Sequence, residues 1–212
     1  FLQISEIVGE EHIGWRYDPI FIDDKYTVKY HLEQFEGISA ALQGYTKNCV
    51  ISFLDLYQKV KRNFPEVKMV SKEQRKYLGQ RMTRIATEHK MILRPCGEGT
   101  ELAAFGADCN GCMTQQIYEN AIHMSLDMPK KQFLRKECAC YLGNDIGAYN
   151  SCPHMCKYCY ANYDEKSVRL NRINHNPKSA FLIGNDMPND KVHKAVQKSW
   201  INGQISLNGF FI

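Results

Sequence analysis

Apolar residues recur along the first hundred positions with two alternating spacings. Residues 1–8, 27–44 and 71–90 have apolar side chains three or four positions apart, which predicts three amphipathic helices. Residues 13–22, 49–54 and 91–94 are short runs of apolar, aromatic and β-branched residues, which predict strands. Helices that alternate with strands in this way predict an α/β fold in which helices cover a parallel sheet.

Local signals place the ends of some of these elements. Thr27 is a suitable N-cap for the second helix, and Ser71 with Gln74 has the spacing of a capping box for the third. Residues 55–62 predict a helical turn and residues 114–124 predict another helix. The periodicity weakens beyond residue 100, and we interpret the basic stretch 129–136 as a solvated connector.

Composition and charge narrow the class of protein. The chain has 212 residues, of which 44% are hydrophobic and 24% are charged, so it is long enough to bury a sizeable core. A net charge of +4 is mild, and we do not expect a nucleic acid partner. No apolar run reaches the roughly 18 residues of a membrane span, and no secretory signal is visible, so we expect no membrane association and a cytoplasmic location.

The cysteines suggest metal ligands. There are nine, an odd number, and five of them lie between residues 138 and 159. A secreted disulfide framework would spread an even set of cysteines along a shorter chain. Clustered thiols in a chain of this length therefore favour a metal site.

The most distinctive cluster is Cys152, Cys156 and Cys159, a C-x3-C-x2-C spacing with Tyr158 before the last thiol. Soft thiolates suit iron–sulfur clusters or zinc. The stretch resembles the signature of radical S-adenosylmethionine (radical SAM) enzymes. In that signature three thiolates bind a 4Fe–4S cluster and leave one iron open for the amino and carboxylate groups of SAM. Tyr158 would pack against such a cluster and shield it.

Two other cysteine pairs leave alternatives open. Cys109 with Cys112, and Cys138 with Cys140, would supply either a second metal site or a fourth ligand to the loop cluster. A fourth thiolate would close the open iron and give an electron-transfer or redox-sensing protein. A third alternative is a zinc-stabilised binding module with four cysteine ligands. Cys49 lies in a predicted buried strand, and we interpret it as a small hydrophobic residue.

The predicted strand ends supply the remaining candidates. Functional residues of parallel α/β folds lie at the carboxyl ends of the strands. Here those ends carry Arg16 and Asp18, then Asp55, then Glu98. A guanidinium and three carboxylates on one rim would hold the methionyl end of SAM or a polar substrate. The structural alternative is that Arg16 and Asp18 pair with each other and that Asp55 caps the next helix.

These residues together resemble a known family over nearly the whole chain. The matching stretches include 15–20, 45–53, 135–140, 145–150, 152–162 and 174–177, together with Cys96 and Glu98. They are similar to the mostly bacterial family called domain of unknown function 1848, whose carboxyl-terminal cysteine cluster is like that of radical SAM domains. The ending Cys156 to Tyr160 is also similar to the cluster loop of spore photoproduct lyase.

The resemblance implies a partial TIM-like (βα) barrel over residues 1–125 and an irregular, cysteine-rich iron–sulfur region over residues 126–212. Family members have further strands upstream, so we expect the present chain to be N-terminally truncated. The family pattern also includes four thiols besides the main three, which implies a second cluster or zinc. These four are Cys96, Cys112, Cys138 and Cys140.

Our prediction at this stage is a radical SAM-type enzyme with a 4Fe–4S cluster and SAM as cofactors. The cluster would be reduced by one electron from a partner such as flavodoxin or ferredoxin, SAM would be cleaved, and hydrogen would be abstracted from a substrate of unknown class. The position of the three-cysteine loop departs from ordinary radical SAM enzymes. In those enzymes the loop follows the first strand, whereas here it follows all of the predicted strands.

Overall fold

The computed structural model describes residues 1–129, 138, 140, 147–191, 193–194, 196 and 198–203. Contacts divide the chain into two compact units. The first comprises the described residues of Phe1–Phe53, Val70–Tyr141 and Lys198–Ile212, and the second those of Leu54–Met69 and Leu142–Gln197. The predicted boundary between domains 1–125 and 126–212 is not tested by this division and stays a prediction.

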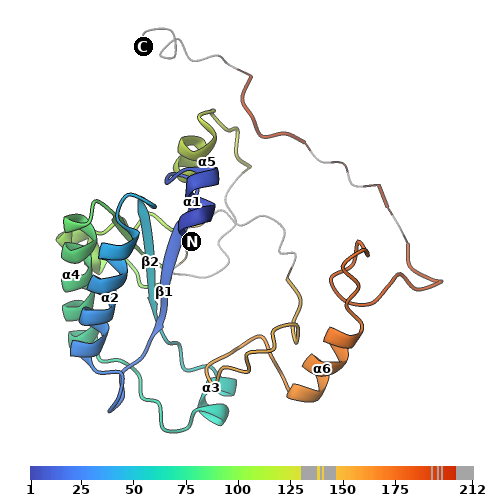
Figure 1. Cartoon of the computed structure of the whole chain (residues 1–212), viewed down its shortest axis with the longest axis horizontal. Helices are drawn as coiled ribbons and strands as arrows, with labels where there is room; N and C mark the ends of the chain where they lie inside the picture. Colours follow the sequence, from blue (N-terminus) through green and yellow to red (C-terminus); the bar gives the residue numbers. More distant parts are fainter. Residues whose placement is uncertain are drawn as a thin grey trace. The chain divides into compact units, whose positions relative to one another are not determined.

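The first unit contains a parallel sheet in the order β1-β2-β3 (Figure 1). The strands are β1 (Gly14–Ile20), β2 (Asn48–Phe53) and β3 (Ile92–Pro95), as the apolar runs predicted. Arg16 of β1 is paired with Val50 of β2, and Val50 in turn with Arg94 of β3. The described strands form an open sheet, so the structure does not support a TIM-like barrel, which needs eight strands to close.

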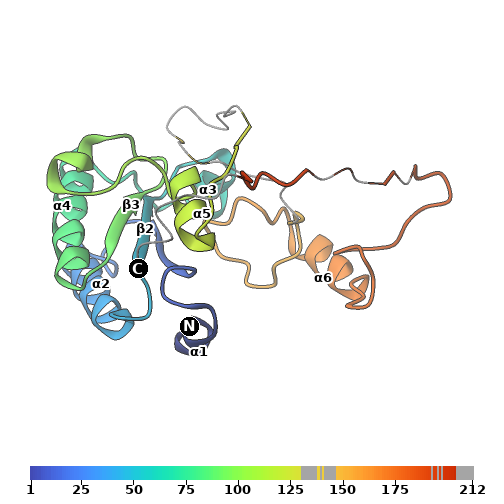
Figure 2. The same cartoon turned by 90° about the horizontal axis from the view of Figure 1, so that it is seen from above.

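Two long helices, α2 (Val28–Leu42) and α4 (Lys72–Glu88), lie side by side on one face of this sheet (Figures 1 and 2). Both begin where the sequence predicted. The Thr27 side chain accepts a hydrogen bond from the N–H of Tyr30, and Ser71 with Gln74 forms a complete capping box. Each cap satisfies backbone donors that the first turn of a helix leaves free.

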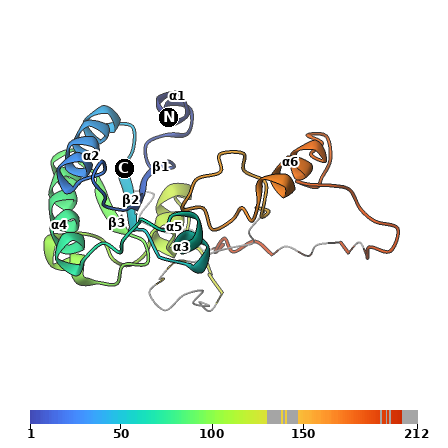
Figure 3. The same cartoon turned by 90° about the horizontal axis from the view of Figure 1, so that it is seen from below.

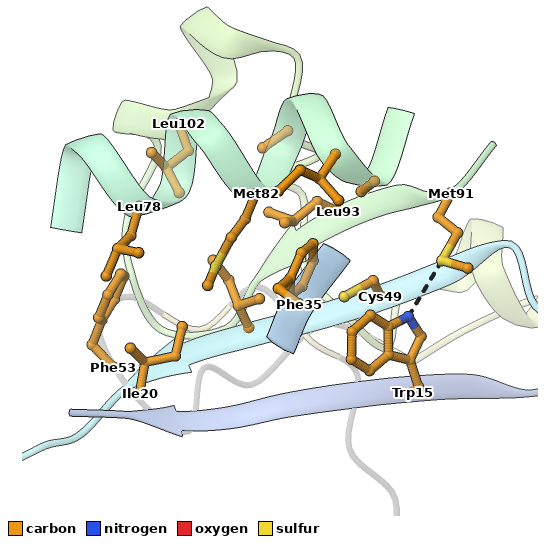
Figure 4. Packing of buried hydrophobic residues seen from close by; sticks show 14 of the residues in the cluster. Trp15, Ile20, Phe35, Cys49, Phe53, Leu78, Met82, Met91, Leu93 and Leu102 are labelled. Atoms are coloured by element: carbon orange, nitrogen blue, oxygen red, sulfur yellow. Dashed lines mark hydrogen bonds between the residues drawn. The ribbon is translucent and has the colours of Figure 1, made fainter. Parts of the chain in front are cut away.

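The core of the first unit lies between the sheet and these helices (Figure 4). Phe35 of α2 packs against Trp15 of β1 with ring centroids 5.1 Å apart. The Trp15 indole N–H donates to the sulfur of Met91 over 3.3 Å, so the one polar atom of this ring is not left without a partner. Cys49 is fully buried in the same cluster, as predicted, and burial raises the pKa of its thiol.

The remaining helices of the first unit are shorter. They are α1 (Leu2–Val8), the 3₁₀ turn η1 (Glu101–Phe105) and α5 (Gln115–Ile122). Sequence periodicity predicted α1 and α5 but missed η1. Most of the predicted basic connector, residues 130–136, lies outside the described residues.

The second unit contains α3 (Gln58–Asn63) and α6 (Glu165–Ile173), with connecting turns between and after them (Figure 3). The sequence predicted a helical turn at α3 but did not predict α6. Its signal is Asp164, whose side chain accepts hydrogen bonds from the N–H and the hydroxyl of Ser167. No helix in the described parts of the chain is long and apolar enough to cross a membrane.

Candidate metal centres

Five cysteines of the first unit line one small cavity of about 10 Å³ beside the ends of its strands. They come from three segments of the chain, and glycines and Pro95 complete the lining. The five are Cys96, Cys109, Cys112, Cys138 and Cys140. We call the four of them other than Cys109 the thiol pocket, because the Cys109 sulfur contacts the carbonyl of Ala107.

The sheet positions the first of these thiols. Cys96 follows β3, and its N–H donates to the carbonyl of Ile51 over 2.8 Å, which extends the sheet ladder by one residue. Gly97 comes next with φ of 73°, a left-handed conformation that glycine adopts without strain. The chain therefore turns away directly after Cys96 and leaves its thiol at the end of the sheet.

A buried arginine positions the second segment. Arg94 of β3 is only 8% exposed, and because side chains alternate along a strand it faces away from the core that contains Leu93. Its guanidinium pairs with Asp108 and also donates to the side chain of Asn48 over 3.1 Å. The Asp108 carboxylate in turn accepts the N–H of Asn110 over 2.9 Å, which shapes the turn leading to Cys112. Sequence reasoning missed this anchor, although an arginine inside an apolar strand signals a buried partner.

The thiols contact one another through hydrogen bonds. The sulfurs of Cys112 and Cys140 are 3.3 Å apart, and the backbone N–H of Cys112 also donates to the Cys140 sulfur over 3.3 Å. Cys96 and Cys138 line the same cavity, where Cys96 influences the pKa of Cys112 and Cys138 that of Cys140. The contact with Cys112 lowers the pKa of Cys96 and of Cys140, and the same contacts raise the pKa of Cys112, because a proton on the Cys112 sulfur stabilises a neighbouring thiolate.

Arg16 lies at the edge of the thiol pocket. Its guanidinium donates to Asp18 over 2.6 Å, which agrees with the structural alternative given above, and lies 3.9 Å from the Cys112 sulfur. The Ser52 hydroxyl donates to Asp18 over 3.3 Å, so β1 and β2 together hold this ion pair in place.

The other two rim candidates have structural partners. The Glu98 side chain is 9% exposed, accepts the N–H of Phe53 over 2.8 Å and pairs with Arg75 over 2.8 Å. These bonds fix the turn after Cys96 to the end of β2. Asp55 belongs to the second unit, where it accepts the Tyr57 hydroxyl over 3.2 Å. The helix that follows has Tyr57 as its N-cap, so Asp55 is not the cap residue.

The C-x3-C-x2-C loop belongs to the second unit. Its base is closed by the N–H of Asn150, which donates to the carbonyl of Ala161 over 3.1 Å. At its tip the N–H of Cys159 donates to the carbonyl of Cys156 over 2.9 Å, in a tight turn preceded by Met155 with φ of 51°. Cys152 and Cys156 are exposed, and Cys159 and Tyr158 are half-buried.

Three bonds attach the loop to its surroundings in the same unit. Lys157 pairs with Glu66 over 2.8 Å, and Lys59 donates to the carbonyl of Tyr160 over 3.2 Å. The Asn162 side chain is 95% buried, as its exposed fraction is 5%, and its Nδ2 donates to the carbonyl of Cys152 over 2.6 Å. Its Oδ1 is buried without a hydrogen-bond partner. Sequence reasoning did not single out Asn162.

The loop borders an open cavity of about 360 Å³. The lining combines two of the thiols with polar side chains: Asn63, Met155, Cys156, Lys157, Cys159, Asn162 and Tyr163. The soft donor set, the exposure of the thiols and the partnerless Asn162 oxygen are compatible with a bound cluster at this place. Within the described residues, however, no three His, Cys, Asp or Glu side chains stand in the geometry of a preformed metal site.

Comparison with known proteins identifies the chain at the level of family. No curated protein and no solved structure matches it. The model of one family, described as domain of unknown function (DUF1848), matches residues 1–161, which include both groups of thiols. Since this match spans well over half of the 212 residues, the chain belongs to the DUF1848 family.

Proposed function

We propose that this protein is a radical SAM-like iron–sulfur protein whose loop cysteines, Cys152, Cys156 and Cys159, hold a 4Fe–4S cluster. The observation that carries the proposal is a loop with exactly three thiols in C-x3-C-x2-C spacing beside an open cavity. When bound, the cluster would supply the electron that cleaves SAM and so starts hydrogen abstraction from a substrate.

The protein's own residues would hold and shelter the cluster. A backbone bond joins Cys159 to Cys156, whose thiols line the same cavity, and the Asn162 bond to the Cys152 carbonyl fixes the first thiol's backbone. Lys59 lies 4.2 Å from the ring centre of Tyr163, and Lys157 pairs with Glu66, so cations border the site. Positive charge favours thiolates and the anionic cluster that they form.

The partnerless Oδ1 of Asn162 adds a specific support. A buried amide oxygen without a donor costs roughly 1–3 kcal/mol, so such atoms are uncommon. In the proposed holoprotein this oxygen would accept a hydrogen bond from a ligand in the cavity, and the amino group of SAM is one donor of suitable chemistry. The electron-transfer alternative offers no ligand of that kind in this cavity.

The proposal is tested by electron paramagnetic resonance (EPR) of protein that has been purified without oxygen, reconstituted with iron and sulfide, and reduced. A cluster signal whose g-values shift when SAM is added would support an open iron that SAM occupies. A cluster signal that SAM leaves unchanged would overturn the SAM step and favour an electron-transfer protein with a fourth ligand. Absence of any iron–sulfur signal would overturn the whole proposal.

A further inference from the structure

We infer that the thiol pocket, Cys96, Cys112, Cys138 and Cys140, is a tetrahedral site for a single zinc ion that is separate from the loop cluster. The inference does not depend on the proposed function. It rests on the convergence of four thiols from three segments, on the size of the cavity that they share and on the donors that surround their sulfurs.

The size of the cavity favours one ion over a cluster. A volume of about 10 Å³ admits about one sphere the size of a water molecule. A 4Fe–4S cubane needs much more space than that, whereas one ion at the centre of four sulfurs does not. Four thiolates around one ion are the typical ligand set of structural zinc sites.

The four thiols, all of them among the described residues, do not form a preformed metal site, but the one sulfur–sulfur contact among them is close to the spacing that zinc requires. Zn–S bonds of about 2.3 Å in a tetrahedron place the sulfurs about 3.8 Å apart. The sulfurs of Cys112 and Cys140 are 3.3 Å apart, so binding would separate this pair by about half an ångström. That small change, with loss of the thiol protons, converts hydrogen-bonded thiols into a coordinated set.

The surroundings of the sulfurs suit the charge that results. Four thiolates and Zn²⁺ carry a net charge of −2, which needs donors around it. The N–H of Cys112 already donates to the Cys140 sulfur, and the Arg16 guanidinium lies 3.9 Å from the Cys112 sulfur. Cys138 and Cys140 are 6% and 5% exposed, so the ion would be shielded from water on their side. Such a closed, four-ligand site has no open position, so its role would be structural.

Cys109 provides a matched control in the same cavity. Its sulfur contacts the carbonyl of Ala107 at 3.9 Å, and its side chain packs against the hydrophobic core. Those contacts make it part of the cavity wall rather than of the ligand set. Cys109→Ala therefore removes a thiol from the lining without removing a ligand.

The test is the metal content of purified protein, measured by elemental mass spectrometry for the full chain as printed. We expect one zinc per chain in the parent, in Cys109→Ala and in a variant with Cys152, Cys156 and Cys159 all changed to Ala. We expect Cys112→Ser to lose at least about 90% of this zinc, a tenfold drop in occupancy. Zinc that disappears with the loop thiols and persists in Cys112→Ser would overturn the inference.

A second measurement covers the case in which Cys112→Ser fails to fold. X-ray absorption at the zinc edge of the parent protein should give four sulfur neighbours at about 2.3 Å. Fewer sulfurs, or nitrogen and oxygen neighbours in their place, would overturn the inference. Iron in the pocket would also overturn the inference. That result would be a parent protein that contains iron but no zinc, and a Cys112→Ser variant that has lost iron. The EPR test of the loop cluster can fail without changing any of these outcomes.

Discussion

The two groups of cysteines have the same ligand chemistry but opposite surroundings. The loop thiols are exposed or half-buried on a turn beside an open cavity of about 360 Å³. The pocket thiols lie at the end of a packed sheet around a cavity of about 10 Å³, and two of them are at least 94% buried, as their exposed fractions are 6% and 5%. The contrast suggests that space and access, rather than the ligand atoms, determine whether thiols suit a reactive cluster or a structural ion.

The two groups of cysteines also differ in how firmly the surrounding protein holds their backbone. Two of the three pocket segments are anchored within the first unit: Cys96 by the sheet ladder, and Cys112 by the turn that Arg94 and Asp108 anchor. The loop is held mainly by surface bonds such as Lys157 to Glu66, whose side chains are 63% and 55% exposed. Exposed ion pairs add little stability, so we expect the loop to depend less on its scaffold and more on the cluster that we propose it binds.

The largest expected effect is loss of the loop cluster without loss of zinc from the thiol pocket. Cys156→Ala removes the middle ligand of the loop, so we expect reconstitution with iron and sulfide to yield no 4Fe–4S cluster, because two thiolates do not hold it. The zinc of the thiol pocket should be unchanged in the same sample. The iron and sulfide contents and the visible absorption report the loss of the cluster, and the zinc content reports the retention of zinc. A fully loaded, SAM-responsive variant would refute the ligand assignment.

The next effect concerns the scaffold of the pocket. Phe35 is fully buried between Trp15 and Tyr17, with ring centroids 5.1 and 5.5 Å away. Phe35→Ala should lower the free energy of unfolding of the first unit by about 3–5 kcal/mol because it leaves a cavity in the core. Both tryptophans of the chain, Trp15 and Trp200, belong to this unit, so their fluorescence in urea reports on its unfolding.

Ile7→Ala is the matched control, since Ile7 is 83% exposed in the same unit and its loss should change stability by less than about 0.5 kcal/mol. We expect Phe35→Ala to weaken zinc retention and to leave the iron content of the reconstituted loop unchanged. Parallel loss of both metals would show that the loop also depends on the core of the first unit.

The sheet and its helices could be predicted from sequence because their signals are local. Apolar spacing gave β1, β2 and β3, and Ser71 with Gln74 gave the start of α4. The predicted barrel was not supported. Three βα units indicate that the strands are parallel, but they do not reveal how many strands complete the sheet. Helix α6 was missed, although Asp164 is a good N-cap for it.

The two cysteine sites also differ in how far the sequence alone could predict them. The loop thiols were apparent because their spacing is a local motif, whereas the thiol pocket joins residues up to 44 positions apart, from Cys96 to Cys140. The family resemblance implied a second metal at the four pocket thiols, but the sequence could not place Arg16 beside them rather than beside a substrate. That placement depends on the pairing of β1 with β2 and on the anchor between Arg94 and Asp108.

A moderate effect is expected at Arg16. Arg16→Gln removes the cation near the Cys112 sulfur and should weaken zinc binding about tenfold, or about 1.4 kcal/mol, because the charge of the four thiolates is then less well balanced. Asp18→Asn is the control, since it removes the partner of Arg16 but keeps the guanidinium. Competition with a coloured zinc chelator gives both dissociation constants. Equal weakening in the two variants would mean that the ion pair, rather than the charge near the sulfur, matters.

The smallest effect is a pH dependence of the unit that carries the pocket. His31 is 5% exposed; its Nδ1 lies 2.8 Å from the Tyr17 hydroxyl and its Nε2 lies 2.7 Å from the carbonyl of Phe21. Tyr30 and Asp23 are the other ionisable groups that face it. Burial lowers the pKa of this imidazole below its usual value of about 6.5, although the Phe21 carbonyl and Asp23 act in the opposite direction.

The sign of the effect follows from linkage. Below about pH 6.5 the unfolded chain binds a proton at His31 more readily than the folded chain does, so stability falls as the pH is lowered in that range. The contribution is fully present above about pH 6.5 and is lost as the pH falls through the lowered pKa. Urea unfolding of the parent between pH 5 and 7.5, followed by tryptophan fluorescence, should show this slope, and His31→Gln should make it shallower. His12→Gln, at an exposed position, should leave the slope unchanged. If His31→Gln kept the full slope, the acid sensitivity would belong to other groups of the first unit, and His31 would not link the pocket's scaffold to pH.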